Sequence, residues 1–222
     1  MAVIVFDVNE TLSDLAPLGE RFVDVGAPGG LLATWFASTL RDGDALGLAG
    51  TPRPFADVAR GVLATLWSQL PELRRDPDEA TEHVLAGFTS LAVHPDVVPG
   101  VGELAVSGHR LVTLSNGARS VAAGLLERAG VAGSFEALLS VEDDDAPGPW
   151  KPDPRAYHYA AQVCGVEPGE LVLVAVHPWD LHGARRAGLR SAYVNRTGAP
   201  WPAVFDRPDV EVGALTELAA AL

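Results

Sequence analysis

Side chains of the types that enzymes use for nucleophilic catalysis lie in four separate segments of the chain. Asp7 follows the apolar run VIVF, Ser115 ends RLVTLS, and His177 follows LVLVAV. Lys151, the only lysine among 16 Lys and Arg residues, lies between the last two segments. A carboxylate is a nucleophile, and a compact ammonium group on a flexible stem can offset its charge beside an anionic substrate. Asp7 is therefore a candidate nucleophile and Lys151 its candidate counter-ion.

The elements that position these side chains are predicted from apolar runs that alternate with helical patterns. Short runs rich in β-branched residues occur at 3–6, 110–114, 171–176 and 191–195, with helically spaced apolar residues between them. Such near-continuous apolar strands are typical of a parallel sheet that helices cover on both faces, an α/β fold. Ligands bind beyond the carboxyl ends of the strands in these sheets, so we expect the candidate residues to meet at one edge.

A long helical segment separates the first predicted strand from the second. The stretches LLATWFASTL and FADVARGVLATLWSQL have helical apolar spacing and weak strand signals. We predict a core made of residues 1–14 and 93–222, and a helical cap of residues 15–92. In the core, EDDDAPGPW at 142–150 is predicted to be a polar loop before a helix over DPRAYHYAAQVCG, and ELAAAL is predicted to be a terminal helix.

Composition and charge restrict the partners. The 222 residues are 48% hydrophobic, enough for a substantial core, and the net charge of −13 gives a pI near 4.7. We expect neither nucleic acid nor an anionic membrane as a partner, because both repel such a surface, and an anionic small-molecule substrate needs a local positive site. Cys164 is the single cysteine, and MAVIVF lacks a basic segment and a long apolar run. We therefore expect a cytoplasmic protein without disulfides or a membrane span.

The chain resembles the haloacid dehalogenase superfamily over nearly its whole length. FDVNETL resembles the first motif, with Asp7 as nucleophile and Thr11 as its support, and LVTLSNG resembles the second, with Ser115. Lys151 resembles the third motif, and VHPWDLHGARRAG, with Asp180, resembles the fourth. Four motifs in this order and spacing are far more specific than any one alone. The resemblance implies a Rossmann-like core with a helical cap inserted after the first strand.

The residue two positions after the nucleophile distinguishes two activities of the superfamily. Superfamily phosphatases have a second Asp there, which protonates the leaving oxygen, whereas this chain has Asn9. An amide cannot supply general acid catalysis, worth about 10²–10⁴ in rate; alkoxide leaving groups need that proton and halides do not. Mg²⁺ prefers carboxylate and water oxygens, and in the fourth motif, VHPWD, only Asp180 stands at a position where the phosphatases have an acidic ligand. We therefore expect no cofactor, with Mg²⁺ only under the phosphatase alternative.

The combination of Asn9, SNG, KPDP and WD resembles the L-2-haloacid dehalogenases. In that family the aspartate attacks the carbon that bears the halogen, displaces halide and forms an ester that water hydrolyses. The resemblance also implies a homodimer and a set of substrate-binding residues. This set comprises the backbone amides of Val8 and Asn9 with Ser115 for the carboxylate, Asn116 and Trp179 for the halide, and Tyr157, which with Asp180 supports Lys151.

The chain departs from the best-known dehalogenases at two positions. Those members carry a halide-binding Arg just after a cap Trp, but here Trp35 is followed by Phe36, whose electropositive ring edge would form a weaker halide cradle. In the fourth motif His177 replaces an Asn. An imidazole with a pKa of about 6.5 can take a proton from water, so we predict that His177 activates the water that attacks the ester. A minority branch of the family has a His/Glu dyad, and we predict Glu20 as the acidic partner.

Three functions are open on sequence alone: a 2-haloacid dehalogenase, a Mg²⁺-dependent small-molecule phosphatase, and a non-catalytic binding protein that keeps the fold. The intact motif residues argue against the third, because a binding module has no need of all of them. Trp67 and Phe88 are predicted to lie in the cap core, and Trp35 fits either the core or the site. The other histidines are expected at the surface or in loops: His83, His94, His109, His158 and His182.

Overall fold

A parallel sheet of six strands forms the centre of the larger lobe. The computed structural model describes residues 2–70, 72–146 and 148–222. The spatial order of the strands is β3-β2-β1-β4-β5-β6, and every neighbouring pair is parallel. This is the order of a Rossmann-like sheet, in which the ligand crevice lies where the strand order reverses. The strands are β1 (Val3–Phe6), β2 (Arg110–Ser115), β3 (Ala137–Ser140), β4 (Leu171–Ala175), β5 (Arg190–Val194) and β6 (Val210–Val212).

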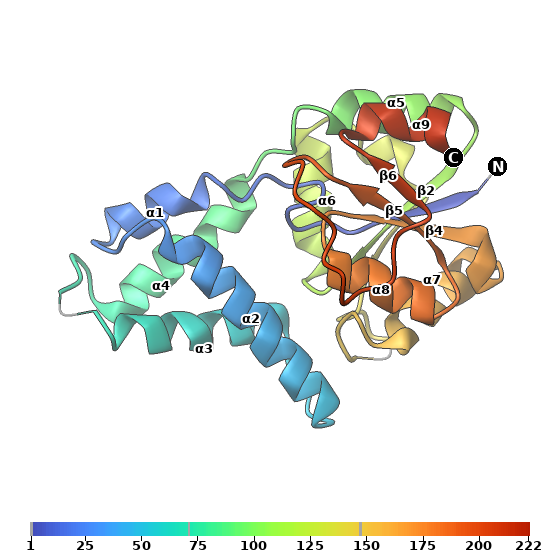
Figure 1. Cartoon of the computed structure of the whole chain (residues 1–222). Coiled ribbons are helices and arrows are strands. Elements are labelled where there is room, and N and C mark those ends of the chain that lie inside the picture. The colour runs from blue at the N-terminus through green and yellow to red at the C-terminus, as the bar shows by residue number, and fades with distance from the viewer. Residues whose placement is uncertain (1, 71, 147) are drawn as a thin grey trace.

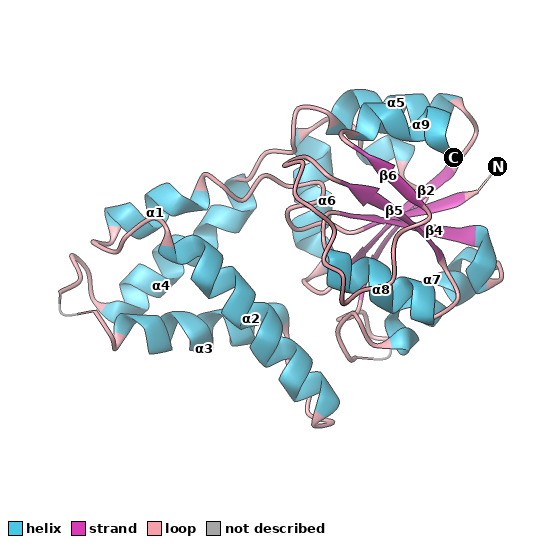
Figure 2. Ribbon diagram, in the orientation of Figure 1, coloured by secondary structure: helices cyan, strands magenta, loops and turns pink. Residues whose placement is uncertain are grey.

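Helices cover both faces of the sheet and form the smaller lobe. The smaller lobe contains α1 (Leu18–Asp24), α2 (Leu31–Leu48), α3 (Phe55–Trp67) and α4 (Pro77–Leu85). The sheet is covered by α5 (Val97–Val106), α6 (Arg119–Arg128), α7 (Pro154–Cys164), α8 (Pro178–Arg186) and α9 (Leu218–Ala221). Figure 2 shows α5 and α9 above the sheet and α7 and α8 below it.

Alternation of side chains along each strand explains why the strands are apolar throughout. On β1, Ile4 and Phe6 pack into the cluster that contains residues of α5, α6 and α9, whereas Val3 and Val5 pack into the cluster that contains residues of α7 and α8. All four side chains are buried. A strand covered on both faces gains from apolar residues at every position, which confirms the prediction from the uninterrupted run VIVF.

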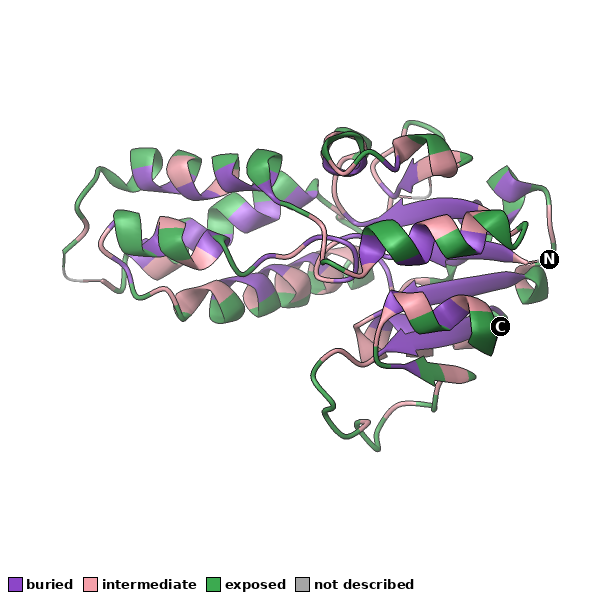
Figure 3. Ribbon diagram, turned by 90° about the horizontal axis from the view of Figure 1, so that it is seen from above, coloured by how far each residue is buried: buried purple, intermediate pink, exposed green. Residues whose placement is uncertain are grey.

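The inserted helices have a core of their own. The Trp35 indole is fully buried and donates a hydrogen bond to the Ala59 carbonyl, 3.0 Å away, so Trp35 is a structural residue of the cap. Trp67 is also buried. Figure 3 shows buried residues on the facing sides of the cap helices and exposed residues on their outer sides. The predicted Rossmann-like core with an inserted helical cap is confirmed, whereas the exact domain bounds at residues 15 and 92 stay a prediction.

Two strands and one detail of the C-terminus differ from the sequence prediction. The apolar runs did not predict β3, whose sequence ALLS has no β-branched residue, or β6, which has only three residues. The predicted terminal helix is a 3₁₀ turn followed by the four residues of α9. The predicted loop at 142–150 includes Pro147, which lies outside the described residues. In the described part of the chain, no helix is both long and apolar enough to cross a membrane.

Candidate active site

The Asp7 carboxylate lies at the carboxyl end of β1, beside the point where the strand order reverses. Its side chain is only 8% exposed. Oδ1 accepts a hydrogen bond from Lys151 Nζ at 2.8 Å, and Oδ2 accepts one from Thr11 Oγ1 at 2.7 Å. Burial acts to raise the pKa of Asp7, but Lys151 and the His177 imidazole outweigh it and hold the pKa well below its usual range. Asp7 is therefore an ionised, oriented carboxylate.

The ammonium group of Lys151 bridges two buried carboxylates. Nζ lies 2.8 Å from Asp7 Oδ1 and 2.6 Å from Asp180 Oδ2, and the side chain is 1% exposed. Burial acts to lower the pKa of Lys151, but Asp180 and Asp7 raise it above its ordinary value, so the ammonium form persists. The Tyr157 hydroxyl donates to Asp180 Oδ1 at 2.7 Å. A single compact cation between two acids explains why a lysine stands here in a chain otherwise rich in arginine.

The loop that carries Lys151 is held by Asn116. The Asn116 Oδ1 atom accepts a hydrogen bond from the backbone amide of Lys151 at 2.9 Å, and its Nδ2 lies 3.4 Å from the Lys151 carbonyl. Asn116 thus positions the counter-ion of the nucleophile. Tyr157 is fully buried and its hydroxyl contacts Asp180, which agrees with its predicted role in supporting Lys151 through Asp180, whereas its predicted part in substrate binding stays a prediction.

His177 lies between two carboxylates. Its Nδ1 is 3.1 Å from Asp7 Oδ2, and its Nε2 is 2.9 Å from Glu10 Oε2. Burial acts to lower the pKa of His177, but the hydrogen bonds to Asp7 and Glu10 raise it from 6.5 to about 9. The imidazole is therefore protonated near neutral pH and donates from both nitrogens. Trp179 stacks on the ring with centroids 5.2 Å apart, and the Phe36 ring lies 6.3 Å from it.

The acidic partner of His177 is Glu10 rather than the predicted Glu20. Helix α1 buries Leu18 and Phe22, which lie one turn apart, so Glu20 lies on the opposite side of the helix and is exposed. Glu10 lies in the turn that follows the nucleophile, three residues after Asp7. The sequence places Glu10 close to Asp7, which could have suggested it as the partner of His177. A sequence does not, however, show in which direction the side chains of a turn point.

Two cavities are lined by residues that directly follow Asp7 in the chain. One, of about 150 Å³, is lined by Val8, Asn9 and Ser115 together with apolar cap residues that include Phe55 and Phe88. The other, of about 600 Å³, is lined by residues that include Glu10, Phe36 and His177. The residues predicted to bind the substrate carboxylate thus line the small cavity, whereas His177, predicted to activate water, lines the larger one.

The residues present do not fit a Mg²⁺ site. Asp7 and Asp180 both direct a carboxylate oxygen to the Lys151 ammonium, and the neighbouring positions carry Asn9 and His177. Within the described ranges, no group of three His, Cys, Asp or Glu side chains is arranged to hold a metal ion. A hard cation needs several oxygen ligands, and here the two buried acids are already paired with an organic cation.

The charge on His177 predicts a pH dependence of folding stability. Because its pKa is raised from 6.5 to about 9, the stabilisation is complete below pH 6.5 and is lost as the pH rises through 9. Between about pH 6 and pH 10, the free energy of unfolding of the unmodified protein, measured with urea, is expected to fall by ~3 kcal/mol more than that of His177→Asn. His182→Asn, a change on helix α8, which begins directly after His177, should keep the steeper profile. Parallel profiles for the unmodified protein and His177→Asn would contradict the charged state assigned to His177.

Comparisons with known proteins agree with this geometry. The family of haloacid dehalogenase-like hydrolases matches residues 1–188. An (S)-2-haloacid dehalogenase of Pseudomonas sp. (strain YL) is 33% identical over 141 residues, which are 63% of this chain and 60% of that protein. The alignment thus spans less than two thirds of this relative. A phosphoserine phosphatase of Thermus thermophilus is 27% identical over 98% of both chains. The solved structure of L-2-haloacid dehalogenase from Xanthobacter autotrophicus superposes with a TM-score of 0.86 and 26% identity, covering 99% of this chain and 97% of that one.

Proposed function

The chain belongs to the haloacid dehalogenase-like hydrolases, and on that premise we propose that it hydrolyses short 2-haloacids to 2-hydroxy acids through an ester on Asp7. The observation that carries the proposal is an ionised, buried Asp7 with an amide, Asn9, in place of the acid that an alkoxide leaving group needs. Displacement of halide requires no such acid. The similarity to proteins named (S)-2-haloacid dehalogenase supports the same substrate class.

In the first step an Asp7 oxygen attacks the substrate carbon that bears the halogen. A C–O bond forms, the C–halogen bond breaks with its electron pair, and halide leaves. Oδ1 is the better placed oxygen, because among the described contacts it accepts one hydrogen bond, from Lys151, whereas Oδ2 has two partners, Thr11 and His177. The substrate carboxylate would lie in the small cavity, near Ser115 and the amides of Val8 and Asn9.

In the second step water attacks the carbonyl carbon of the Asp7 ester, and His177 takes a proton from that water. The bond between this carbon and the oxygen that carries the substrate then breaks, the departing oxygen receives the proton from His177, and the 2-hydroxy acid leaves Asp7 as a carboxylate. In the free enzyme the negative charges of Asp7 and Glu10 keep the pKa of His177 raised. Esterification removes the charge of Asp7. The loss of one of these partners lowers the affinity of His177 for its proton. The imidazole therefore becomes a competent base once the ester has formed, and Glu10 continues to orient it.

The phosphatase alternative has weaker support from the site. The similarity to a phosphoserine phosphatase shows that this chemistry occurs among relatives of the chain. Asn9, however, cannot protonate an alkoxide, and the two buried acids that would hold Mg²⁺ face Lys151. The dehalogenase proposal requires no metal for either step.

A paired assay tests the proposed function. We expect halide release from L-2-chloropropionate in the presence of EDTA, little release from the D isomer, and no phosphate release from p-nitrophenyl phosphate with Mg²⁺. The expected preference for the L isomer rests on the similarity to proteins named (S)-2-haloacid dehalogenase. Phosphate release without halide release would show that another group supplies the acid absent at Asn9, and that the proposed activity is wrong.

A further inference from the structure

We propose that His94 is a positioning residue that holds Glu10 against His177 and thereby sets the rate at which the Asp7 ester is hydrolysed. The proposal rests on the proposed function of the site. The sequence predicted no role for His94 beyond that of a surface or loop residue. The structure instead places it in contact with the backbone of Glu10.

Glu10 has a backbone conformation that is unfavourable for a residue with a side chain. Its φ of 60° lies in the left-handed region, and it is the one residue other than glycine with a positive φ in the described part of the chain. An L-residue stays in this region only where its surroundings hold it there, and such residues cluster at functional sites. The Glu10 carboxylate, at 2.9 Å from His177 Nε2, depends on this conformation for its direction.

The contact that holds the Glu10 backbone comes from His94. His94 Nε2 lies 2.9 Å from the carbonyl oxygen of Glu10, to which it donates a hydrogen bond. His94 is itself fixed, because its backbone amide donates to the Leu12 carbonyl at 2.9 Å, and Val93 forms an antiparallel bridge with Ser13. The segment that returns from the cap to the core therefore clamps the turn that carries Glu10.

The effect of His94 is expected to fall mainly on the second chemical step. In the free enzyme His177 has two carboxylate partners, Asp7 and Glu10. Once Asp7 is esterified, Glu10 is the remaining charged partner that fixes the ring and its tautomer. His94 lines the same cavity as Glu10 and His177, so water reaches this group of residues. Loss of the His94 hydrogen bond should release Glu10 and slow hydrolysis, while ester formation proceeds as before.

The test compares His94→Leu, which removes the donor, with His94→Gln, which keeps an N–H donor. In single turnovers followed by rapid quench and intact mass, His94→Leu is expected to slow ester hydrolysis by about tenfold, with ester formation changed less than about twofold. His94→Gln should recover much of the rate. An NMR titration of the His177 ring in the free protein should show a lower pKa in His94→Leu.

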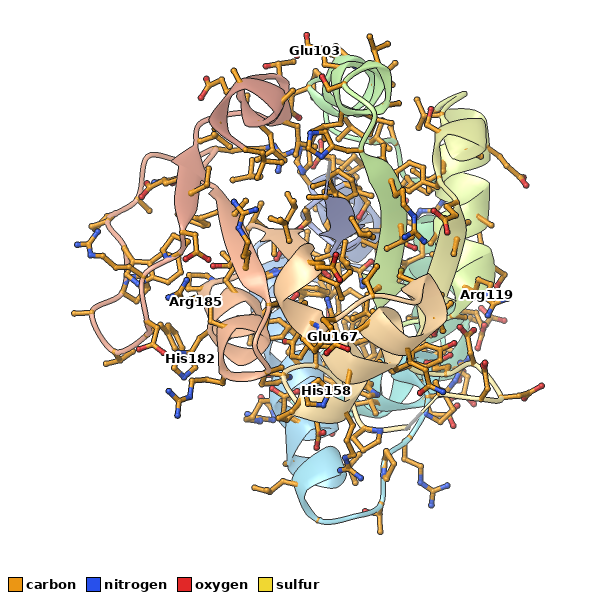
Figure 4. All side chains as sticks on the ribbon, turned by 90° about the vertical axis from the view of Figure 1, so that its right-hand side faces the viewer. Glu103, Arg119, His158, Glu167, His182 and Arg185 are labelled. Atoms are coloured by element: carbon orange, nitrogen blue, oxygen red, sulfur yellow. The ribbon has the colours of Figure 1, made fainter. Side chains whose placement is uncertain are left out.

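His158 provides a matched control. Its Nε2 also lies within hydrogen-bond distance of a backbone carbonyl, that of Ala187, at 3.0 Å. Figure 4, which views the molecule from the side away from the cap, shows His158 on that face of the core. His158→Leu should therefore leave both chemical steps and the titration of His177 unchanged. Equal slowing of hydrolysis in His158→Leu would overturn the proposal.

A double-mutant cycle separates a role through Glu10 from a general structural role. In a Glu10→Gln background His94→Leu should slow hydrolysis no further, because the carboxylate that it positions is already gone. An additional tenfold loss in that background, or a normal rate and a normal His177 titration in His94→Leu, would overturn the proposal. An unmodified enzyme that forms neither halide nor ester would instead contradict the proposed function, and the titration of His177 would still decide the role of His94.

Discussion

Replacement of Asp7 by Asn is expected to reduce halide release from L-2-chloropropionate by more than about 10⁴-fold, because an amide is a far weaker nucleophile than a carboxylate. The loss should appear in ester formation, so no covalent adduct is expected in the intact mass. Lys151 keeps a partner in this variant, since its ammonium group still lies 2.6 Å from Asp180. The site should therefore retain its positive group, and the variant should fold.

The control for this change is another carboxylate replaced by its amide. Asp144 is exposed on the loop after β3, and Asp144→Asn should release halide at the unmodified rate. Deamidation of the introduced amide would regenerate the carboxylate and restore activity, so the mass of the purified Asp7→Asn variant is checked before the assay. Substantial halide release by intact Asp7→Asn would show that water or another side chain displaces the halide, and that Asp7 is not the nucleophile.

Replacement of His177 by Asn is expected to slow hydrolysis of the ester by about 10²–10⁴-fold, the usual contribution of a general base. Asp7, Thr11 and Lys151 remain in place, so ester formation should continue. The enzyme should then release one equivalent of halide in a burst and accumulate an adduct on Asp7. Intact mass and peptide mapping after mixing with substrate measure this adduct directly.

His182→Asn is the control for the change at His177, because both histidines belong to the same segment at α8. His182 Nδ1 accepts a hydrogen bond from the Asp206 amide, outside the site. This control should show steady turnover without a burst. A His177→Asn enzyme that turns over at the normal rate, with no trapped ester, would remove His177 from the hydrolytic step.

In the unmodified enzyme the same mechanism predicts that ester hydrolysis depends on pH. Free His177, with its pKa raised to about 9, is protonated at neutral pH, and esterification of Asp7 should lower this pKa. The rate of ester hydrolysis should therefore rise with pH over the interval between about 6.5 and 9, whereas ester formation should vary little there because Asp7 stays ionised.

The sequence was sufficient for residues whose position follows from the fold. Asp7 directly follows a strand with apolar residues at every position, and the carboxyl ends of neighbouring parallel strands lie at the same edge of the sheet, which brings Ser115 and His177 close to Asp7. Lys151 was identified because it is the only lysine of the chain and because it matches the third motif of the superfamily. The helical cap followed from a change in hydrophobic period between residues 15 and 92.

The sequence was insufficient where a side-chain direction depends on an unusual backbone or on tertiary contacts. Glu10 faces His177 with a φ of 60°, and a glutamate does not signal that conformation in a sequence, as a glycine or an Asn would. The sequence predicted Glu20 as the partner of His177, but α1 buries the opposite side of the helix and leaves Glu20 exposed to solvent. The role of His94 depends on a contact between residues 84 positions apart, which a local pattern cannot show.

The proposed mechanism depends on an ester on Asp7, and a single turnover in H₂¹⁸O is its sharpest test. Water that attacks the ester carbonyl leaves its oxygen in the Asp7 carboxylate, while the hydroxyl oxygen of the product comes from Asp7. With enzyme in excess over L-2-chloropropionate, we predict ¹⁸O in the peptide that contains Asp7 and unlabelled lactate. Labelled lactate and an unlabelled Asp7 peptide would show that water displaces the halide directly, and would contradict the mechanism.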